Sequence, residues 1–119
     1  MMQDPGRYDM TIWQGATFQR VFTWRVGSPA ANVNLTGYTA RMQLRTAPNA
    51  TTAALEATTE NGRITLGGAA GTVTLDLSAT VTAALPANQY AYDLELVSGS
   101  GQVTRLLEGF ATVDAEVTR

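Results

Sequence analysis

The sequence contains no cysteine and no histidine among its 119 residues. Without cysteine the chain has neither a disulfide framework nor a thiolate metal site. Without histidine it lacks the commonest general base and the commonest metal ligand. Nucleophilic catalysis by a serine–histidine pair therefore has no base. We expect a protein that is not an enzyme, with no catalytic, cofactor-binding or metal-binding residues.

Lysine is also absent, so arginine supplies all eight positive charges. These arginines are scattered from Arg7 to Arg119, and the net charge is −2. Nucleic-acid-binding proteins usually show a clustered basic patch, so we expect no nucleic-acid partner. The longest apolar runs are only a few residues, too short to span a membrane. The N-terminus lacks a basic region followed by an apolar stretch, so no signal peptide is expected.

The clearest positive feature is alternation of apolar and polar residues between Gly62 and Val97. The segments Gly62–Leu66 and Thr72–Ser78 alternate on either side of the glycine-rich turn Gly67–Gly71, and Tyr90–Val97 repeats the pattern. A period of two is typical of a strand with one buried face. The stretch predicts a β-hairpin and a further strand, and these would frame the domain.

The rest of the chain adds further short strands and turns. Ala54–Ala57 allows a strand or a helical turn, and its flanking threonines favour the strand. Asn61-Gly62 is a hairpin signal, and Gly109 indicates a bulge or a close backbone approach. Ser78 can cap a helical turn over Ala79–Leu85. The other predicted strands are Tyr8–Ile12, Thr17–Val26, Tyr38–Arg45 and Val103–Val113.

This spacing predicts an all-β fold, an antiparallel β-sandwich of seven to eight strands with an Ig-like layout and one short helical turn. We expect a flexible N-terminal arm over residues 1–7, the sandwich over 8–113 and a C-terminal tail over 114–119. Alternation within the strands predicts which residues face inward. The expected core includes Phe22, Met42, Leu75, Tyr92 and Leu94.

Two groups of residues invite a chemical interpretation that the pattern does not favour. A carboxylate site could be formed by Asp76, Asp93 and Glu95. Each occupies an outward strand position, however, so a solvent-exposed strand face is the simpler interpretation. Gly67–Gly71 resembles a phosphate-binding loop in glycine content alone, because no Lys-Ser/Thr and no helix follow it. A flexible hairpin turn explains this segment.

The aromatic residues could line a carbohydrate groove, although core packing accounts for most of them. Trp13 is the exception, because it follows a strand and precedes a glycine turn. Arg41 and Arg45 lie on the polar side of their strand. Arginine and aromatic residues are enriched at protein interfaces, so Trp13, Arg41 and Arg45 are the candidate interface residues.

Four segments together resemble a known group of proteins: Tyr8–Phe18, Asn34–Arg45, Tyr92–Leu96 and Thr104–Gly109. They are similar to small virion proteins of tailed phages that resemble the N-terminal β-sandwich module of phage baseplate proteins, the carriers of receptor-binding proteins. The resemblance extends from about Tyr8 to Arg119. It implies a structural subunit of the virion, made in the bacterial cytoplasm and present in several copies. Its partners would be copies of itself and other virion proteins, with no small-molecule substrate.

Within a virion, the resemblance favours an accessory component of the tail, baseplate or neck. A capsid decoration protein that clamps the shell is the second interpretation. A carbohydrate-binding module, which belongs to a different functional class, is the third.

Overall fold

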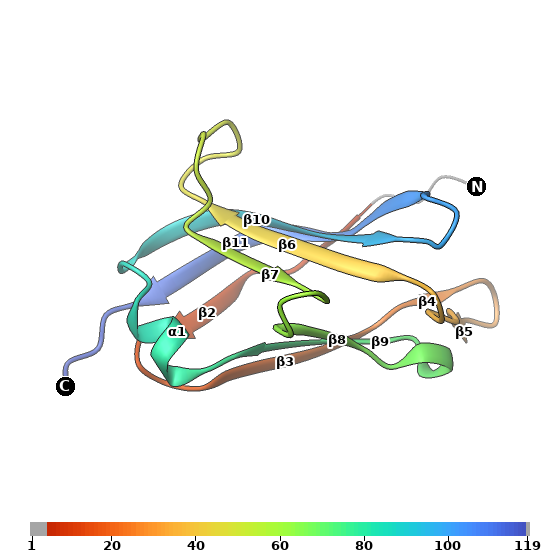
Figure 1. Cartoon of the computed structure of the whole chain (residues 1–119), viewed down its shortest axis with the longest axis horizontal. Coiled ribbons are helices and arrows are strands. Elements are labelled where there is room, and N and C mark those ends of the chain that lie inside the picture. The colour runs from red at the N-terminus through yellow and green to blue at the C-terminus, as the bar shows by residue number, and fades with distance from the viewer. Residues whose placement is uncertain (1–4, 119) are drawn as a thin grey trace.

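Two β-sheets pack face to face in the computed structural model, which describes residues 5–118 (Figure 1). The larger sheet has six strands in the order β1-β11-β10-β6-β7, with β2 also paired to β11. The smaller sheet has the order β3-β9-β8, and β4 and β5 form a short ribbon at one end. Helix α1 lies at the other end (Figure 1). The predicted all-β sandwich is confirmed, with eleven strands among the described residues, some of only two residues, where seven to eight were expected.

The strand and helix boundaries agree with the alternation in the sequence over most of the chain. The strands are β1 (Gly6–Arg7), β2 (Met10–Trp13), β3 (Phe18–Thr23), β4 (Arg25–Val26), β5 (Ala31–Asn32), β6 (Thr39–Arg45), β7 (Leu55–Thr58), β8 (Ile64–Leu66), β9 (Thr72–Leu77), β10 (Asn88–Val97) and β11 (Val103–Asp114). The helical segments are η1 (Gly68–Ala70) and α1 (Ala79–Ala83). The segment Ala54–Ala57 contributes a strand, as predicted, and the expected strand over Thr17–Val26 is divided at Trp24.

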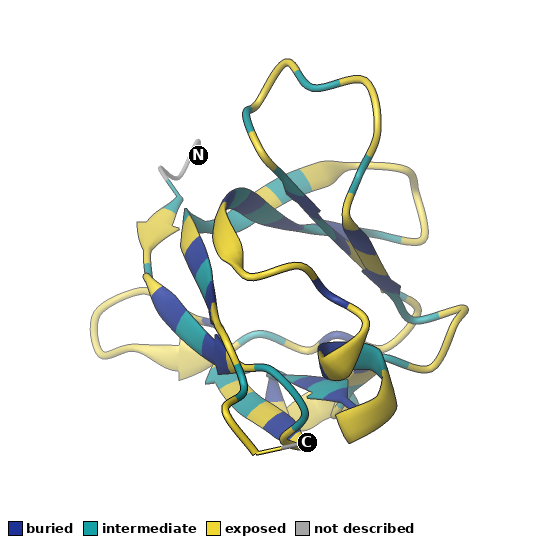
Figure 2. Ribbon diagram, turned by 90° about the vertical axis from the view of Figure 1, so that its left-hand side faces the viewer, coloured by how far each residue is buried: buried dark blue, intermediate teal, exposed yellow. Residues whose placement is uncertain are grey.

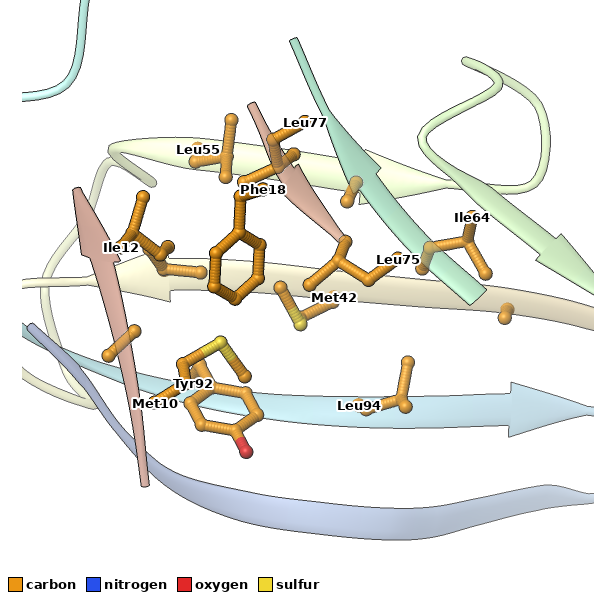
Figure 3. Close-up of a cluster of buried hydrophobic side chains, with 14 of the residues drawn as sticks. Met10, Ile12, Phe18, Met42, Leu55, Ile64, Leu75, Leu77, Tyr92 and Leu94 are labelled. Carbon is orange, nitrogen blue, oxygen red and sulfur yellow. The ribbon is translucent and has the colours of Figure 1, made fainter. Parts of the chain in front are cut away.

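The core fills the space between the two sheets. Burial alternates residue by residue along β6, β9 and β10, which are therefore buried on one face (Figure 2). Figure 3 shows side chains from both sheets converging there, including Met42, Leu75, Tyr92 and Leu94. These four predicted core residues are buried. Phe22, the fifth, is only partly buried, because it lies on a strand at the edge of the smaller sheet.

Most strands pair antiparallel, but the first two segments pair parallel to the last strand. Gly6 lies opposite Leu107 in β11, and Met10 lies opposite Ala111. The predicted arm was therefore wrong at Gly6 and Arg7, which belong to the sheet; residues 1–4 lie outside the described part. At the other end, Asp114 continues β11 instead of beginning the tail.

One predicted hairpin forms and another does not. Strands β8 and β9 pair through the glycine turn, with Ile64 opposite Leu75. By contrast, β7 and β8 belong to different sheets, so the hairpin expected at Asn61-Gly62 is wrong. The Asn61 side chain accepts hydrogen bonds from the backbone N–H groups of Thr58 and Arg63. It thereby stabilises a crossing between the sheets.

Helix α1 begins as predicted, with the Ser78 hydroxyl accepting a hydrogen bond from the Val81 N–H at 3.2 Å. The fully buried residue of the helix is Thr82, whose importance the sequence did not indicate. Its hydroxyl accepts from the Gly15 N–H at 3.0 Å and donates to the Ala16 carbonyl oxygen at 2.9 Å. Thr82 thus ties the helix to the turn between β2 and β3.

Gly109 permits a close backbone approach, one of the two predicted roles. A Cβ atom there would collide with the Tyr8 carbonyl oxygen and the Asp9 carboxylate. The bulge in β11 lies elsewhere: Leu107 faces Leu94 and Arg105 faces Glu95, which leaves Leu106 as the extra residue. Glycine at position 109 therefore lets the N-terminal segment lie directly against β11.

Candidate interaction face

The six-stranded sheet presents a polar surface on the side away from the core, which we call the outer face. Inward residues of β6, β10 and β11 are apolar, so the same alternation places polar residues outward. On β6 these outward residues include Arg41, Gln43 and Arg45. The loop between β6 and β7 stands above this sheet (Figure 1).

Cross-strand ion pairs organise the centre of the outer face. The Arg41 Nε lies 2.8 Å from the Glu95 Oε1 on the neighbouring strand. Arg105 contacts two carboxylates, with its Nε 3.5 Å from the Asp93 Oδ2 and its Nη1 3.2 Å from the Glu108 Oε1. Opposite charges on neighbouring strands, together with the Arg105–Glu108 pair within β11, connect these side chains in an array across the sheet.

Burial raises the pKa of the Asp93 carboxyl above its usual value of 3.8, with a smaller opposing effect from Arg105. The nearby Glu95 and Glu108 also raise this pKa, and Arg41 lowers it. Arg105 therefore offsets only part of the cost of ionising Asp93. The centre of the outer face carries a carboxylate that would gain from a further cationic partner.

Two shallow depressions lie on the outer face, and Asp93 borders both. The larger has a volume of about 580 Å³, and Phe110 contributes an exposed ring to its lining. The Arg7 guanidinium carbon lies 5.1 Å from the centre of that ring. Cations at this distance interact favourably with an aromatic face. An aromatic ring, a cation and hydrogen-bonding groups thus meet in one hollow.

The three predicted interface residues all belong to the six-stranded sheet but do not meet. Arg45 lines the larger depression, where its guanidinium donates to the Gln43 Oε1 at 2.6 Å and to the Ala50 carbonyl oxygen at 2.8 Å. Arg41 lines the smaller depression. Trp13 is 51% exposed at the end of β2, and β11 and β10 lie between β2 and β6. Trp13 therefore marks a separate part of the surface.

Sequence reasoning missed Phe110 and Arg7. Arg7 had been placed in the arm, so its position beside β11 was not foreseen. Phe110 could have been found from alternation, because Ala111 and Val113 face inward and the period of two places Phe110 outward. A large apolar residue at an outward position is a signal for an interaction surface.

Most of the aromatic residues belong to the core, as predicted, and do not form a sugar groove. Phe18, Trp24, Tyr90 and Tyr92 are buried. The three carboxylates considered for a joint site are divided between the sheets: Asp93 and Glu95 lie on β10, and Asp76 on β9 accepts a hydrogen bond from the Gln19 Nε2 at 2.8 Å. The structure therefore does not bring Asp76 to the other two.

Within residues 5–118, no group of three or more acidic side chains is placed to hold a metal ion. In the same part of the chain, neither helical segment has the length and apolar character to cross a membrane. No protein-family model matches the chain, and the curated proteins contain no match to it.

Proposed function

We propose that the protein is a non-enzymatic structural subunit of a tailed-phage virion, an accessory part of the tail, baseplate or neck. It would act in several copies through protein–protein contacts. The observation that carries the proposal is the outer face, where Arg45 and Phe110 lie in one hollow beside an ordered array of charges. Arginine and aromatic residues with satisfied polar neighbours are typical of protein interfaces.

The arrangement of the four segments that resemble phage virion proteins supports the same proposal. Tyr8–Phe18 contains β2, Asn34–Arg45 ends in β6, Tyr92–Leu96 lies in β10 and Thr104–Gly109 lies in β11. All four segments contribute strands to the six-stranded sheet. The resemblance is therefore concentrated in the layer that carries the outer face.

The decisive experiment is to locate the chain in particles made by cells that encode it, by immunogold labelling and mass spectrometry of purified particles. A few labels at the tail or neck would support the proposal. Labels spread over the shell would favour capsid decoration instead, and purified particles without the chain would contradict both.

A matched pair of variants tests the role of the outer face. Replacing Arg41 and Arg45 together by Glu should reduce incorporation into particles by about tenfold or more, since it reverses charge at the proposed contact. The control is Arg25→Glu on β4, an exposed residue outside the six-stranded sheet. Equal incorporation of both variants, each folded by circular dichroism, would show that the outer face is not the contact.

A carbohydrate-binding role is the second candidate, and Phe110 is the observation that favours it. Its exposed ring beside charged and amide side chains offers the stacking and hydrogen bonding that sugars use. A glycan array separates the two functions. Binding that is lost in Phe110→Ala but retained in Trp13→Ala would establish the carbohydrate role at this depression.

A further inference from the structure

The open edge of the smaller sheet is strand β3, which pairs only with β9 among the described residues. An edge strand presents unpaired N–H and C=O groups that can be extended by another chain. With six residues, β3 is longer than the β8 edge of the same sheet, which has three. The register between β3 and β9 is continuous from Phe18 to Thr23, so no bulge interrupts this edge.

The hydrogen-bonding pattern identifies the backbone groups that point outward. The Trp24 N–H donates to the Gly71 carbonyl oxygen at 2.9 Å, which continues the β3–β9 ladder by one bonded pair. Bonded pairs alternate in an antiparallel ladder, so Phe22 and its alternate neighbours point toward β9. The groups of Gln19, Val21 and Thr23 therefore point to the open side. In agreement, the Gln19 carbonyl oxygen accepts from the Arg20 Nη1 at 2.8 Å.

The exposed edge of the larger sheet at β7 is protected differently. Its outward Glu56 carbonyl oxygen accepts from the Asn61 Nδ2 at 3.0 Å and from the Arg63 Nη1 at 2.8 Å. The Thr58 N–H donates to the Asn61 Oδ1 at 2.9 Å. Side chains thus occupy the groups that another strand would need. Among the described residues, Arg20 caps the Gln19 carbonyl oxygen of β3, and no side chain contacts the outward backbone groups of Val21.

The side chains of β3 also fit an uncovered edge. Val21 is 57% exposed, and the inward residue Phe22 remains partly exposed. On β9, the next strand inward, Val73 and Leu75 are buried almost completely. Another strand beside β3 would complete the burial of Phe22. Exposed apolar groups next to unpaired backbone favour a partner that forms β-structure.

We propose that this partner is a second copy of the chain, paired antiparallel through β3 about a two-fold axis at Val21. The three outward residues are evenly spaced around Val21, so a two-fold axis there places Val21 opposite its own copy and Gln19 opposite Thr23 of the other copy. Once the Arg20 guanidinium releases the Gln19 carbonyl oxygen, all outward groups meet in bonded pairs, giving about six new backbone hydrogen bonds. The two small sheets become one continuous sheet of six strands. Arg20 of each copy lies opposite Phe22 of the other, while its guanidinium lies 4.4 Å from the Phe18 ring centre and its Nε donates to the Tyr8 hydroxyl at 3.1 Å.

This inference deepens the proposed function. It rests on that function only for the biological role of the dimer, which would be assembly within a virion. The pairing itself is a property of the isolated protein, so it can be tested without particles. If the isolated protein does not dimerise, the proposed role in virions still stands. If the protein does not enter particles, the proposed dimer still stands.

Cysteine cross-linking tests the axis directly, because the natural chain contains no cysteine. Bonded antiparallel pairs hold their Cα atoms about 5.5 Å apart, within the range for a disulfide. Val21→Cys should therefore form a covalent dimer under mild oxidation. Gln19→Cys, on the same edge, faces Thr23 and should cross-link about tenfold less. Equal cross-linking of the two variants, or none in either, would overturn the two-fold axis at Val21.

Sedimentation equilibrium gives an independent measurement. The unaltered protein should show a dimer at about 100 µM, and Val21→Pro should be monomeric, because proline removes the outward N–H without breaking the ladder to β9. Val21→Lys, which leaves the backbone unchanged, should have the same effect if the proline variant does not fold. A monomeric unaltered protein, or a dimer that persists in a folded variant, would contradict the proposal.

Discussion

Thr82 shows how much one buried hydroxyl contributes at the end of the sandwich. It is completely buried, and it satisfies the Gly15 N–H and the Ala16 carbonyl oxygen of the turn between β2 and β3. A second carbonyl oxygen, that of Ala79, lies 3.1 Å from the same hydroxyl. Removing the hydroxyl would leave buried polar groups without partners, which is costly.

We therefore predict that Thr82→Val lowers the free energy of unfolding by about 1–3 kcal/mol, because the volume is kept and the hydrogen bonds are lost. Urea denaturation followed by circular dichroism measures this change. Thr80→Val on the exposed side of the same helix is the control and should change stability by less than about 0.5 kcal/mol. Similar losses in both variants would show that helix propensity, and not the hydroxyl, is responsible.

Asp93 makes the stability of the folded protein depend on pH. Burial raises the pKa of its carboxyl, so the folded state holds this proton more tightly than the unfolded state. The stability gained from the protonated form is complete below the unfolded pKa and is lost as the pH rises through the folded pKa. At neutral pH the ionised carboxylate therefore opposes folding.

We predict that Asp93→Asn becomes more stable relative to the unaltered protein as the pH rises from about 3 to 7, since the amide does not ionise. Urea denaturation at several pH values gives the difference. Arg105→Leu should steepen the loss of stability with rising pH, because Arg105 lowers this pKa. A difference between Asp93→Asn and the unaltered protein that does not vary with pH would contradict the assignment.

At the scale of elements, the crossing from β7 to β8 depends on Asn61. Its side chain makes three hydrogen bonds to backbone groups, and two of these cover the outward edge of β7. Asn61 thus stabilises the turn between β7 and β8 and also covers the outward edge of β7. Hydrogen bonds of this kind contribute about 0.5–1.5 kcal/mol each.

We predict that Asn61→Ala lowers stability by about 1–2 kcal/mol and increases self-association, because it opens the β7 edge. Light scattering during slow heating measures the association. Asn49→Ala, an exposed residue in the loop between β6 and β7, should do neither. If both variants behave alike, Asn61 does not protect the edge.

Alternation predicted the long strands well because each has one buried face. It correctly assigned β6, β9 and β10 and the inward positions of Met42 and Leu94. It failed at Asn61-Gly62, because the same two residues suit a hairpin and a crossing between sheets. It also missed Thr82 and Phe110. The burial of the first depends on a turn about 65 residues away, and the hollow at the second depends on pairing with the N-terminal segment.

At the scale of the whole molecule, the N-terminal segment adds to the sheet and to the candidate site. Gly6 and Arg7 pair with β11, and Arg7 lies against Phe110. We predict that deleting residues 1–7 lowers stability by about 1 kcal/mol, or the melting temperature by roughly 4 °C. Calorimetry measures this shift. Deleting residues 1–4 retains β1 and should have a smaller effect. Equal melting temperatures of the two deletion variants would show that β1 does not contribute to stability.

The parallel pairing of β2 with β11 also bears on how the chain folds. Met10 meets Ala111 across about a hundred residues, so this pairing must close almost the entire chain into one loop. Contacts this distant in sequence are associated with slow folding. During synthesis β2 emerges about a hundred residues before β11, so the Met10 and Ile12 side chains wait for the strand that pairs beside them. A nascent chain of this protein therefore carries an incomplete core until β11 has followed β2 out of the ribosome.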